Sequence, residues 1–353
     1  MLPSRFRRSL PEFFDFSGTT HAFAKGITEA MVQETPCPFD MYPDMQCETL
    51  RDALAAHEGV GPENILPGNG ASELIWLLME DLQPRKVLFL GPMYAEYVRF
   101  CLLRGIEYSI ATPPPEHDFV CDPATLRAIW DSNADLAVVC IPNNPGGNSY
   151  PDMQEIFGAL RVPRVIVDAS YREFLWGEPS YTSGSWKTCA AQPGTSVFTI
   201  ASFSYFFACP GLRLGYLVGD PGHLRRMAVN RPLWMVSPHA QAVGARMLES
   251  IERYREMLLP LRARREDMAL RLRRMASFDP YRVFTGPAFV TAGLAGGVSS
   301  ASVVETLIRQ GFVVRNCDTV PGMPPGYIRM AVRPGKETEK LLDILDWHAE
   351  RGW

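Results

Sequence analysis

Strand-like and helix-like segments alternate through much of this chain, and no other feature of the sequence constrains its fold as strongly. The strand-like segments are short apolar runs rich in β-branched or aromatic residues and bounded by turn-forming residues. Helical patterns lie between them, with Ser72 and Asp122-Pro123 as start signals. This alternation predicts an α/β fold with a largely parallel central sheet. The expected strands lie within 86–92, 136–142, 162–170, 195–202 and 212–220, and the expected helices within 72–82, 95–105 and 122–132.

The pattern changes near residue 238, where a long, amphipathic and highly charged helical stretch begins. We expect one interruption of this stretch, at Pro260. Further strand-like and helical segments follow it, which predicts a second, smaller α+β domain. We therefore divide the chain into an N-terminal arm (1–40), a large domain (41–240) and a small C-terminal domain (241–353).

Charge and cysteine content argue against several classes of function. Lys+Arg 35 against Asp+Glu 39 gives a net charge of −4, whereas nucleic acids and membrane surfaces recruit excess basic charge. The start of the chain has no apolar signal region, and no run approaches the roughly 18 apolar residues of a membrane span. The 8 cysteines are scattered, without a CxxC pair or neighbouring histidines. We expect no metal site, and reduced thiols in a cytoplasmic protein.

Two segments carry residues suited to a phosphate. In GNGASELI (68–75), Gly70, Ala71 and Ser72 form a turn that opens a helix, where free N–H groups and the helix dipole attract an anion. Taken alone, an ordinary glycine-rich helix cap explains this segment at least as well. In the segment 202–217, Ser202, Ser204 and Arg213 supply two hydroxyls and a bidentate guanidinium, which suit a dianionic phosphate.

Other motifs at predicted strand ends suit a flat heteroaromatic ring. Tyr94 in PMYAEY can stack on such a ring, and Asn144 in IPNNPGG can donate a hydrogen bond to a phenolate-like oxygen. In VDASY, the Asp168 carboxylate can face a pyridine nitrogen and keep it protonated, with Tyr171 three residues later. A rim aromatic, a plain Asn-Pro-Gly turn and a helix N-cap are the structural alternatives.

A late strand-like segment, YIRMAVRP (327–334), carries two arginines among apolar neighbours. Arg329 and Arg333 suit a substrate carboxylate if the strand is half-buried. A surface ion pair is the alternative for both.

In this order and spacing, the motifs resemble the class I/II aminotransferase family, and within it histidinol-phosphate aminotransferase and threonine-phosphate decarboxylase. The likeness covers nearly the whole chain, and MYPDMQCETLRDAL (41–54) resembles the segment whose tyrosine, here Tyr42, reaches the cofactor phosphate of a partner subunit. The resemblance implies the fold-type I fold, with a mostly parallel seven-stranded sheet in the large, cofactor-binding domain. It also implies a homodimer and a pyridoxal 5'-phosphate or pyridoxamine 5'-phosphate cofactor. By that likeness the phosphate is held by Gly70, Ala71, Ser72, Ser202, Ser204 and Arg213, the ring by Tyr94, Asn144, Asp168 and Tyr171, and the substrate carboxylate by Arg329.

The chain departs from the family at one decisive position. By the resemblance, the residue after Ser204 is the lysine that forms a Schiff base with the cofactor, eight residues before the phosphate-binding arginine. Here that residue is Tyr205, and Arg213 keeps the register. A phenol forms no imine, and because it titrates near pH 10 it is a poor base but a competent proton donor at neutral pH.

Other departures accompany this one. The family's Asn-containing loop reads GTTHAF (18–23), and the lysines Lys25 and Lys187 are better explained as solvated surface residues than as substitutes for the missing one. Three interpretations remain open. The first is a lysine-less enzyme that binds the cofactor non-covalently and uses Tyr205, with Asp168, Tyr171 and Asn144, for catalysis. The others are an inactive binding protein and a cofactor-independent enzyme that reuses the cleft.

Overall fold

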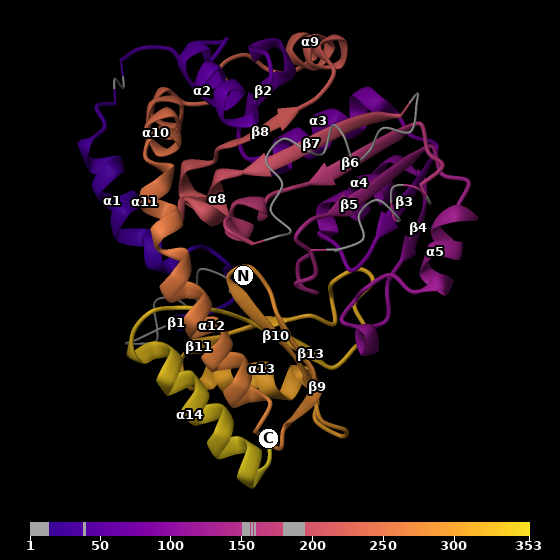
Figure 1. The fold of residues 1–353 in the computed structure, drawn as a ribbon, viewed down its shortest axis with the longest axis vertical. Helices are drawn as coiled ribbons and strands as arrows, with labels where there is room; N and C mark the ends of the chain where they lie inside the picture. Colours follow the sequence, from indigo (N-terminus) through magenta and orange to yellow (C-terminus); the bar gives the residue numbers. More distant parts are fainter. Residues whose placement is uncertain (1–13, 38–39, 150–155, 157, 159, 179–194) are drawn as a thin grey trace.

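A seven-stranded sheet forms the centre of the larger part of the chain (Figure 1). In this computed structural model, residues 14–37, 40–149, 156, 158, 160–178 and 195–353 are described. One strand, β8, runs antiparallel to both of its neighbours, and the other adjacent strands pair in parallel. The predicted mostly parallel α/β sheet is therefore confirmed. Its strands, in spatial order, are β2 (Ile65–Gly68), β8 (Gly215–Val218), β7 (Ser196–Ser202), β6 (Arg164–Asp168), β5 (Leu136–Cys140), β3 (Lys86–Leu90) and β4 (Glu107–Ala111).

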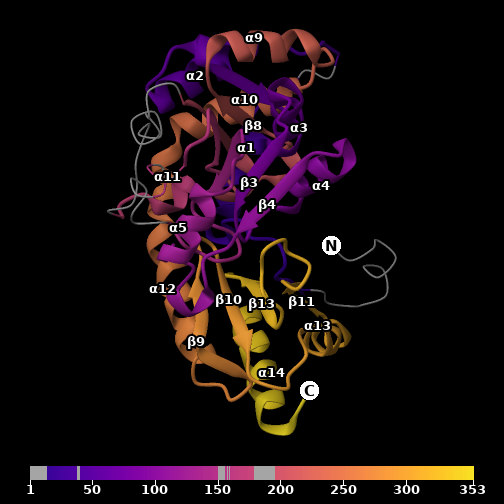
Figure 2. The ribbon, with the colours of Figure 1, turned by 90° about the vertical axis from the view of Figure 1, so that its right-hand side faces the viewer.

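Helices cover both faces of this sheet, because successive side chains of each strand point to opposite sides. Val87 and Phe89 of β3 pack with α3 and α4, whereas Leu88 and Leu90 face the cluster that includes Ile129 of α5. Figure 2 shows α3 and α4 on one side of the sheet and α5 on the other. The helices of this part are α1 (Lys25–Glu34), α2 (Glu48–Glu58), α3 (Ala71–Leu82), α4 (Ala95–Arg104), α5 (Pro123–Trp130), α8 (Phe203–Phe206) and α9 (Pro221–Asn230).

Three consecutive helices lead from the large sheet to the C-terminal part (Figure 1). The expected break at Pro260 is wrong: the helices are interrupted at Ser250 and Met257, and Pro260 lies in the first turn of the last one. Proline is tolerated there because the first-turn N–H groups have no partner within the helix. These helices are α10 (Pro238–Glu249), α11 (Ile251–Glu256) and α12 (Leu258–Leu272).

The C-terminal part contains a four-stranded antiparallel sheet, with α13 and α14 nearby. The N-terminal strand β1 joins this part by pairing in parallel with β11. The division at residues 40 and 240 stays a prediction. The elements are β1 (Phe14–Asp15), β9 (Phe278–Thr285), β10 (Phe289–Leu294), β11 (Phe312–Val313), β12 (Arg315–Asn316), β13 (Tyr327–Ala331), α13 (Ser300–Arg309) and α14 (Lys336–Arg351).

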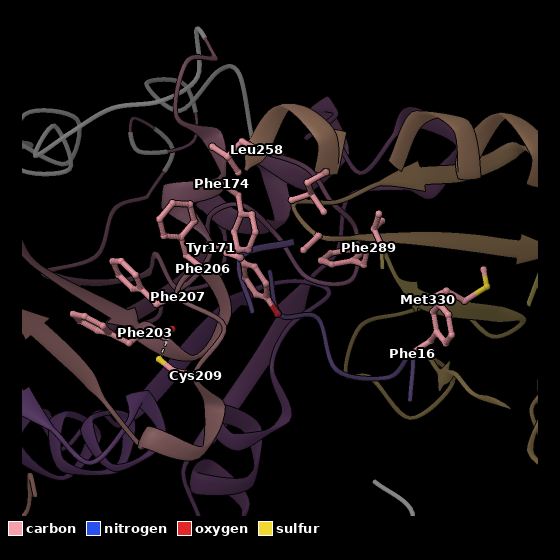
Figure 3. Close-up of a cluster of buried hydrophobic side chains, with 14 of the residues drawn as sticks. Phe16, Tyr171, Phe174, Phe203, Phe206, Phe207, Cys209, Leu258, Phe289 and Met330 are labelled. Atoms are coloured by element: carbon pink, nitrogen blue, oxygen red, sulfur yellow. Dashed lines mark hydrogen bonds between the residues drawn. The ribbon is translucent and has the colours of Figure 1, made fainter. Parts of the chain in front are cut away.

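An aromatic cluster connects the two parts. Phe174 and Phe289 pack against the ring of Tyr171 at centroid separations of 6.0 and 6.1 Å, and Phe206 packs edge-on against Phe174 (Figure 3). Aromatic pairs at such centroid separations add packing energy beyond simple burial. Tyr171 is therefore held rigidly on its apolar side.

No helix among the described residues is long and apolar enough to cross a membrane.

Candidate active site

The site lies along the side of the large sheet at which its parallel strands end, and we call this side the carboxyl-end edge. Strands from distant parts of the sequence end there next to one another. Gly68 pairs with Gly215, and Gly215 pairs with Ser202. Asp168, at the end of β6, pairs with Ile200 and with Cys140. In open α/β sheets, ligands bind at the carboxyl ends of the parallel strands. The register therefore brings the predicted Ser202 and Asp168 to the same edge as the glycine-rich turn.

The glycine-rich turn forms a helix start of the kind that suits an anion. Gly70 is the N-cap of α3, with φ +81°, so the expected N-cap at Ser72 is wrong: Ser72 lies in the first turn, which a left-handed glycine precedes. A Cβ on Gly70 would overlap the guanidinium of Arg213. The free N–H groups of the first turn and the Arg213 guanidinium thus face the same space, which favours a phosphate.

Gly215 allows this close approach. A Cβ at Gly215 would lie 2.7 Å from the amide nitrogen of Ala71 and 2.9 Å from the carbonyl oxygen of Ala201. These are backbone atoms, which cannot move aside. The start of α3 therefore rests directly on β8.

The two serines predicted for phosphate binding lie at the junction of β7 and α8. The Ser202 hydroxyl oxygen accepts a hydrogen bond from the Ser204 amide, 3.2 Å away, and so caps α8. Ser204 is buried. The exposed Arg213 donates to the carbonyl oxygen of Pro210, 3.1 Å away, from a left-handed backbone position.

Asp168 is a buried carboxylate without a cationic partner. It is 4% exposed, and among the residues that the structure describes no Lys, Arg or His forms an ion pair with it. The buried Tyr97 hydroxyl donates to Oδ2 at 3.1 Å, and the Ser170 amide donates to Oδ1 at 3.1 Å. Burial raises the pKa of the Asp168 carboxyl, and the hydrogen bonds from Ser170 and Tyr97 partly offset that rise.

The hydroxyl of Tyr171 is the centre of a polar network. The Asn144 amide nitrogen lies 2.8 Å from it, and the Thr19 hydroxyl lies 2.5 Å from it. Arg329, which reaches this point from β13, donates to the Asn144 side-chain oxygen and to the Ser17 carbonyl oxygen, the latter at 2.8 Å. Two predicted residues of the large domain and one of the small domain therefore meet here.

Tyr205 lies against this network. Its half-buried ring stacks on the Tyr171 ring at a centroid separation of 4.2 Å and an interplanar angle of 21°. Burial raises the pKa of Tyr205 to about 12, Tyr94 and Asp168 act in the same direction, and Tyr171 and Arg329 partly oppose them. Tyr205 therefore keeps its proton throughout the neutral range.

The segment Ser17–His21, which we call the N-terminal loop, lies over both tyrosines. The His21 amide donates to the Tyr205 carbonyl oxygen at 2.8 Å. The His21 ring is buried against Phe174 and Phe206, with Nε2 3.3 Å from the Tyr254 carbonyl oxygen and Nδ1 without a hydrogen-bond partner among the residues that the structure describes. Burial lowers the pKa of His21 to about 4, so its imidazole is neutral at pH 7.

A buried ion network supports the segment that follows Tyr171. Arg172 forms hydrogen bonds with both carboxylate oxygens of Glu58, at 2.5 and 3.1 Å, and the Tyr216 hydroxyl also donates to Glu58. Both side chains of this ion pair are almost fully buried. Glu173, next in sequence, contacts His57 and Arg255 at 3.1 Å each, and the side-chain hydrogen bond of His57 and the charge of Arg172 outweigh burial to hold its pKa near 2.

Three predicted site residues lie outside this network. Tyr94 is 45% exposed, immediately before α4, although it is near enough to affect the pKa of Tyr205. Arg333 lies over the ring of Phe16, with its guanidinium carbon 5.5 Å from the centroid. Tyr42 is 79% exposed and packs on Trp234 with a centroid separation of 4.7 Å.

Two of the lysines with described positions, Lys25 and Lys86, form ion pairs with glutamates. Lys25 pairs with Glu29 at 3.4 Å on the surface, and Lys86 pairs with Glu107. Lys187 lies outside the described residues.

Residues that the sequence analysis missed complete the site. Tyr97 lies three residues after Tyr94, and residues at this spacing are neighbours on a helix. This spacing was therefore a usable signal that Tyr97 belongs to the same site. Thr19 and His21 gave no such signal, because nothing local in GTTHAF indicates a contact with residues more than 150 positions away.

Comparison with known proteins finds relatives over most of the chain. The chain is 27% identical over 341 residues to threonine-phosphate decarboxylase of Salmonella typhimurium, covering 95% of this chain and 90% of that protein. It is 29% identical to histidinol-phosphate aminotransferase of Desulfitobacterium hafniense (strain Y51), covering 87% and 83%. The structure of histidinol-phosphate aminotransferase from Sinorhizobium meliloti in complex with pyridoxal-5'-phosphate superimposes with a TM-score of 0.81 at 20% identity, covering 99% of this chain and 95% of that one. Residues 17–346 match the family "Aminotransferase class I and II", and the chain therefore belongs to that family.

Proposed function

We propose that this protein is an aminotransferase- or decarboxylase-type enzyme that acts on an amino acid or a related amine or keto acid. It holds pyridoxal or pyridoxamine phosphate without a covalent bond, and Tyr205 stands where relatives have the Schiff-base lysine. The observation that carries the proposal is the buried Asp168 carboxylate, without a described cationic partner, at the same sheet edge as an anion-binding helix start. A protein that had lost the cofactor would gain nothing from retaining this unfavourable carboxylate.

The residues at this edge fit such a cofactor. A protonated pyridine nitrogen would supply the positive partner that Asp168 lacks. The start of α3 with Arg213 suits the phosphate dianion, and the donors of Asn144 and Tyr171 suit the ring oxygen. Tyr94, at the edge of the site, is placed for contact with the ring.

When bound, this cofactor supplies an electron-withdrawing ring that weakens the bonds of the adjacent substrate carbon. The protein's own residues do the rest. Arg329 binds the substrate carboxylate, and its buried Nε, which has no hydrogen-bond partner in the described part of the chain, remains available as a donor for this purpose. Tyr205 donates a proton to the reacting carbon, because its high pKa keeps the hydroxyl protonated. Tyr97 orients Asp168.

The substrate class rests on Arg329 and on the relatives. Arg329 already contacts Asn144 and Ser17, so a carboxylate that enters here meets a fixed guanidinium. Two of the relatives are named for threonine phosphate and histidinol phosphate, which supports an amino-acid-like compound.

Borohydride reduction followed by peptide mapping tests the proposal. Purified protein should bind pyridoxal phosphate, measured by fluorescence titration, and yield no reduced covalent adduct. An adduct on Lys25 or Lys187 would refute the lysine-less arrangement. An absence of any cofactor binding would refute the cofactor itself.

Two substitutions at one position provide matched controls. Tyr205→Lys should produce a borohydride-reducible bond at residue 205, because Asp168 and the helix start are left in place. Tyr205→Phe should leave cofactor affinity nearly unchanged and abolish turnover, since only the hydroxyl is removed. If Tyr205→Phe retains full turnover, Tyr205 is not the proton donor.

We also propose that the protein forms a homodimer in which Tyr42 reaches the partner's cofactor phosphate. Support comes from exposed apolar side chains around it, including Met41, Met45 and Trp234, beside a surface hollow of about 580 Å³. Contiguous apolar surface of this kind marks association sites. Light scattering should give twice the monomer mass, and a monomer at micromolar concentration would refute the proposal.

A further inference from the structure

The N-terminal loop contacts both stacked tyrosines and the arginine of β13. Thr19 contacts the Tyr171 hydroxyl, the His21 amide holds the Tyr205 carbonyl oxygen, and Arg329 binds the Ser17 carbonyl oxygen. Thr19 is 3% exposed, as is Tyr171. In a buried hydroxyl pair 2.5 Å apart, only one of the two groups donates to the other at a time, and the distance alone allows either to be the donor.

The direction of one donation follows from Arg329. A guanidinium only donates, so the Asn144 atom that faces Arg329 must be the oxygen. The other end of the amide, its NH₂ group, therefore faces Tyr171 and donates to the phenol oxygen at 2.8 Å. Tyr171 accepts at least one hydrogen bond whatever the state of Thr19.

The hydroxyls of Thr19 and Tyr171 carry one hydrogen each, and only one of these two hydrogens can lie between the two oxygens. If Tyr171 donated, the Thr19 hydrogen would be buried without an acceptor among the described residues, which is costly. If Thr19 donates, the Tyr171 hydrogen is equally buried, but it has a possible partner in Tyr205, with which Tyr171 interacts through its side chain. The second arrangement leaves that hydrogen facing Tyr205, whose ring stacks on Tyr171, or a ligand oxygen.

We propose that Thr19 is a positioning residue: its hydroxyl donates to Tyr171 and directs the Tyr171 hydrogen toward Tyr205 and the bound cofactor. This inference deepens the proposed function and rests on it. The result is a one-way donor series that starts at Thr19 and passes to Tyr171, with Asn144, held by Arg329, as the second donor to Tyr171. The single hydroxyl hydrogen of Tyr171 faces Tyr205 in the cofactor-free protein and donates to the ring oxygen when the cofactor is bound. The effect of Tyr171 on Tyr205, which opposes the rise in pKa of the latter, agrees with donation in this direction.

A double-mutant cycle in the cofactor-free protein tests the contact itself. Urea unfolding is measured for the wild type, Thr19→Val, Tyr171→Phe and the double variant. Thr19→Val raises the unfolding equilibrium constant by some factor in each background. That factor should be about fivefold larger in the wild type than in Tyr171→Phe. Thr19→Ser, which retains the hydroxyl, should show the same coupling as the wild type. Equal effects of Thr19→Val in both backgrounds would overturn the proposal.

The pH titration of bound pyridoxal phosphate, followed by its absorption spectrum, tests the direction. Loss of the Thr19 donor weakens the hydrogen bond of Tyr171 to the ring oxygen. Thr19→Val should therefore shift the titration upward by about half to one pH unit, with Thr19→Ser unshifted. A downward shift would show that Tyr171 donates to Thr19 and would overturn the proposal. If the wild type binds no cofactor, the proposed function fails, while the cycle still decides whether Thr19 positions Tyr171.

Discussion

The buried His21 should make the protein lose stability on mild acidification. Burial lowers its pKa in the folded state to about 4, from a reference value of 6.5. Between these values the unfolded chain binds a proton that the folded chain does not, so the free energy of unfolding falls as pH falls from 6.5 toward 4. Above pH 6.5 the imidazole is neutral in both states and no loss arises. Integrating this difference gives a loss of about 2 kcal/mol between pH 7.5 and pH 5.

Urea unfolding at several pH values, followed by tryptophan fluorescence, measures this loss. His21→Leu removes the titrating group at similar volume, so the difference in unfolding free energy between wild type and variant should shrink by about 2 kcal/mol from pH 7.5 to pH 5. His117→Leu, at an exposed histidine, is the matched control and should follow the wild type. A difference between wild type and His21→Leu that stays constant over this pH range would refute the reasoning.

Four further predictions follow from the site. Gly215→Ala should lower the free energy of unfolding by about 1–3 kcal/mol in urea titrations, because its Cβ would meet backbone atoms of Ala71 and Ala201. Glu58→Leu should cost about 3–5 kcal/mol by leaving Arg172 partly uncompensated, and a second change, Arg172→Met, should recover part of it. Arg213→Ala should weaken pyridoxal phosphate binding by about 1.5–3 kcal/mol in fluorescence titrations, and unchanged affinity would contradict its phosphate role. Because the pKa of Tyr205 is about 12, kcat/KM should show no alkaline decline from this residue up to pH 10; a decline below pH 10 that moves to lower pH when a fluorinated, more acidic tyrosine replaces Tyr205 would contradict this.

The sequence predicted the interior of the large sheet better than its edges. The five expected strands are all present, whereas β2 and β4, which the apolar pattern did not reveal, are the two edge strands. β4 is only partly buried, so its residues need not be uniformly apolar, and β2 is short and ends in Pro-Gly. A strand that has a paired neighbour on just one side therefore carries a weaker apolar pattern in its sequence.

The site was predictable where residues end strands or open helices, and unpredictable where contacts depend on tertiary packing. Asp168 and Gly70 occupy positions fixed by local structure, and the structure places them at one edge. The contact of Thr19 with Tyr171 depends on how the N-terminal segment packs, and this is encoded by β1 pairing with β11 near the other end of the chain. No local pattern contains that information.

The reversed strand β8 has a consequence for how such a site can change over generations. Because β7 ends and β8 begins at the same edge, residues 203–214 leave the sheet and return to adjacent positions, with Ser202 opposite Gly215. The pairing of β7 with β8 fixes both ends of this segment, and the start of α3 rests on β8. A side chain within residues 203–214, such as that of Tyr205, can therefore be exchanged while the strand pairing keeps Ser202 and the start of α3 in place. Under the proposed function, Tyr205 acts in the chemistry and the start of α3 in phosphate binding, so a single codon change can alter the first and leave the second intact.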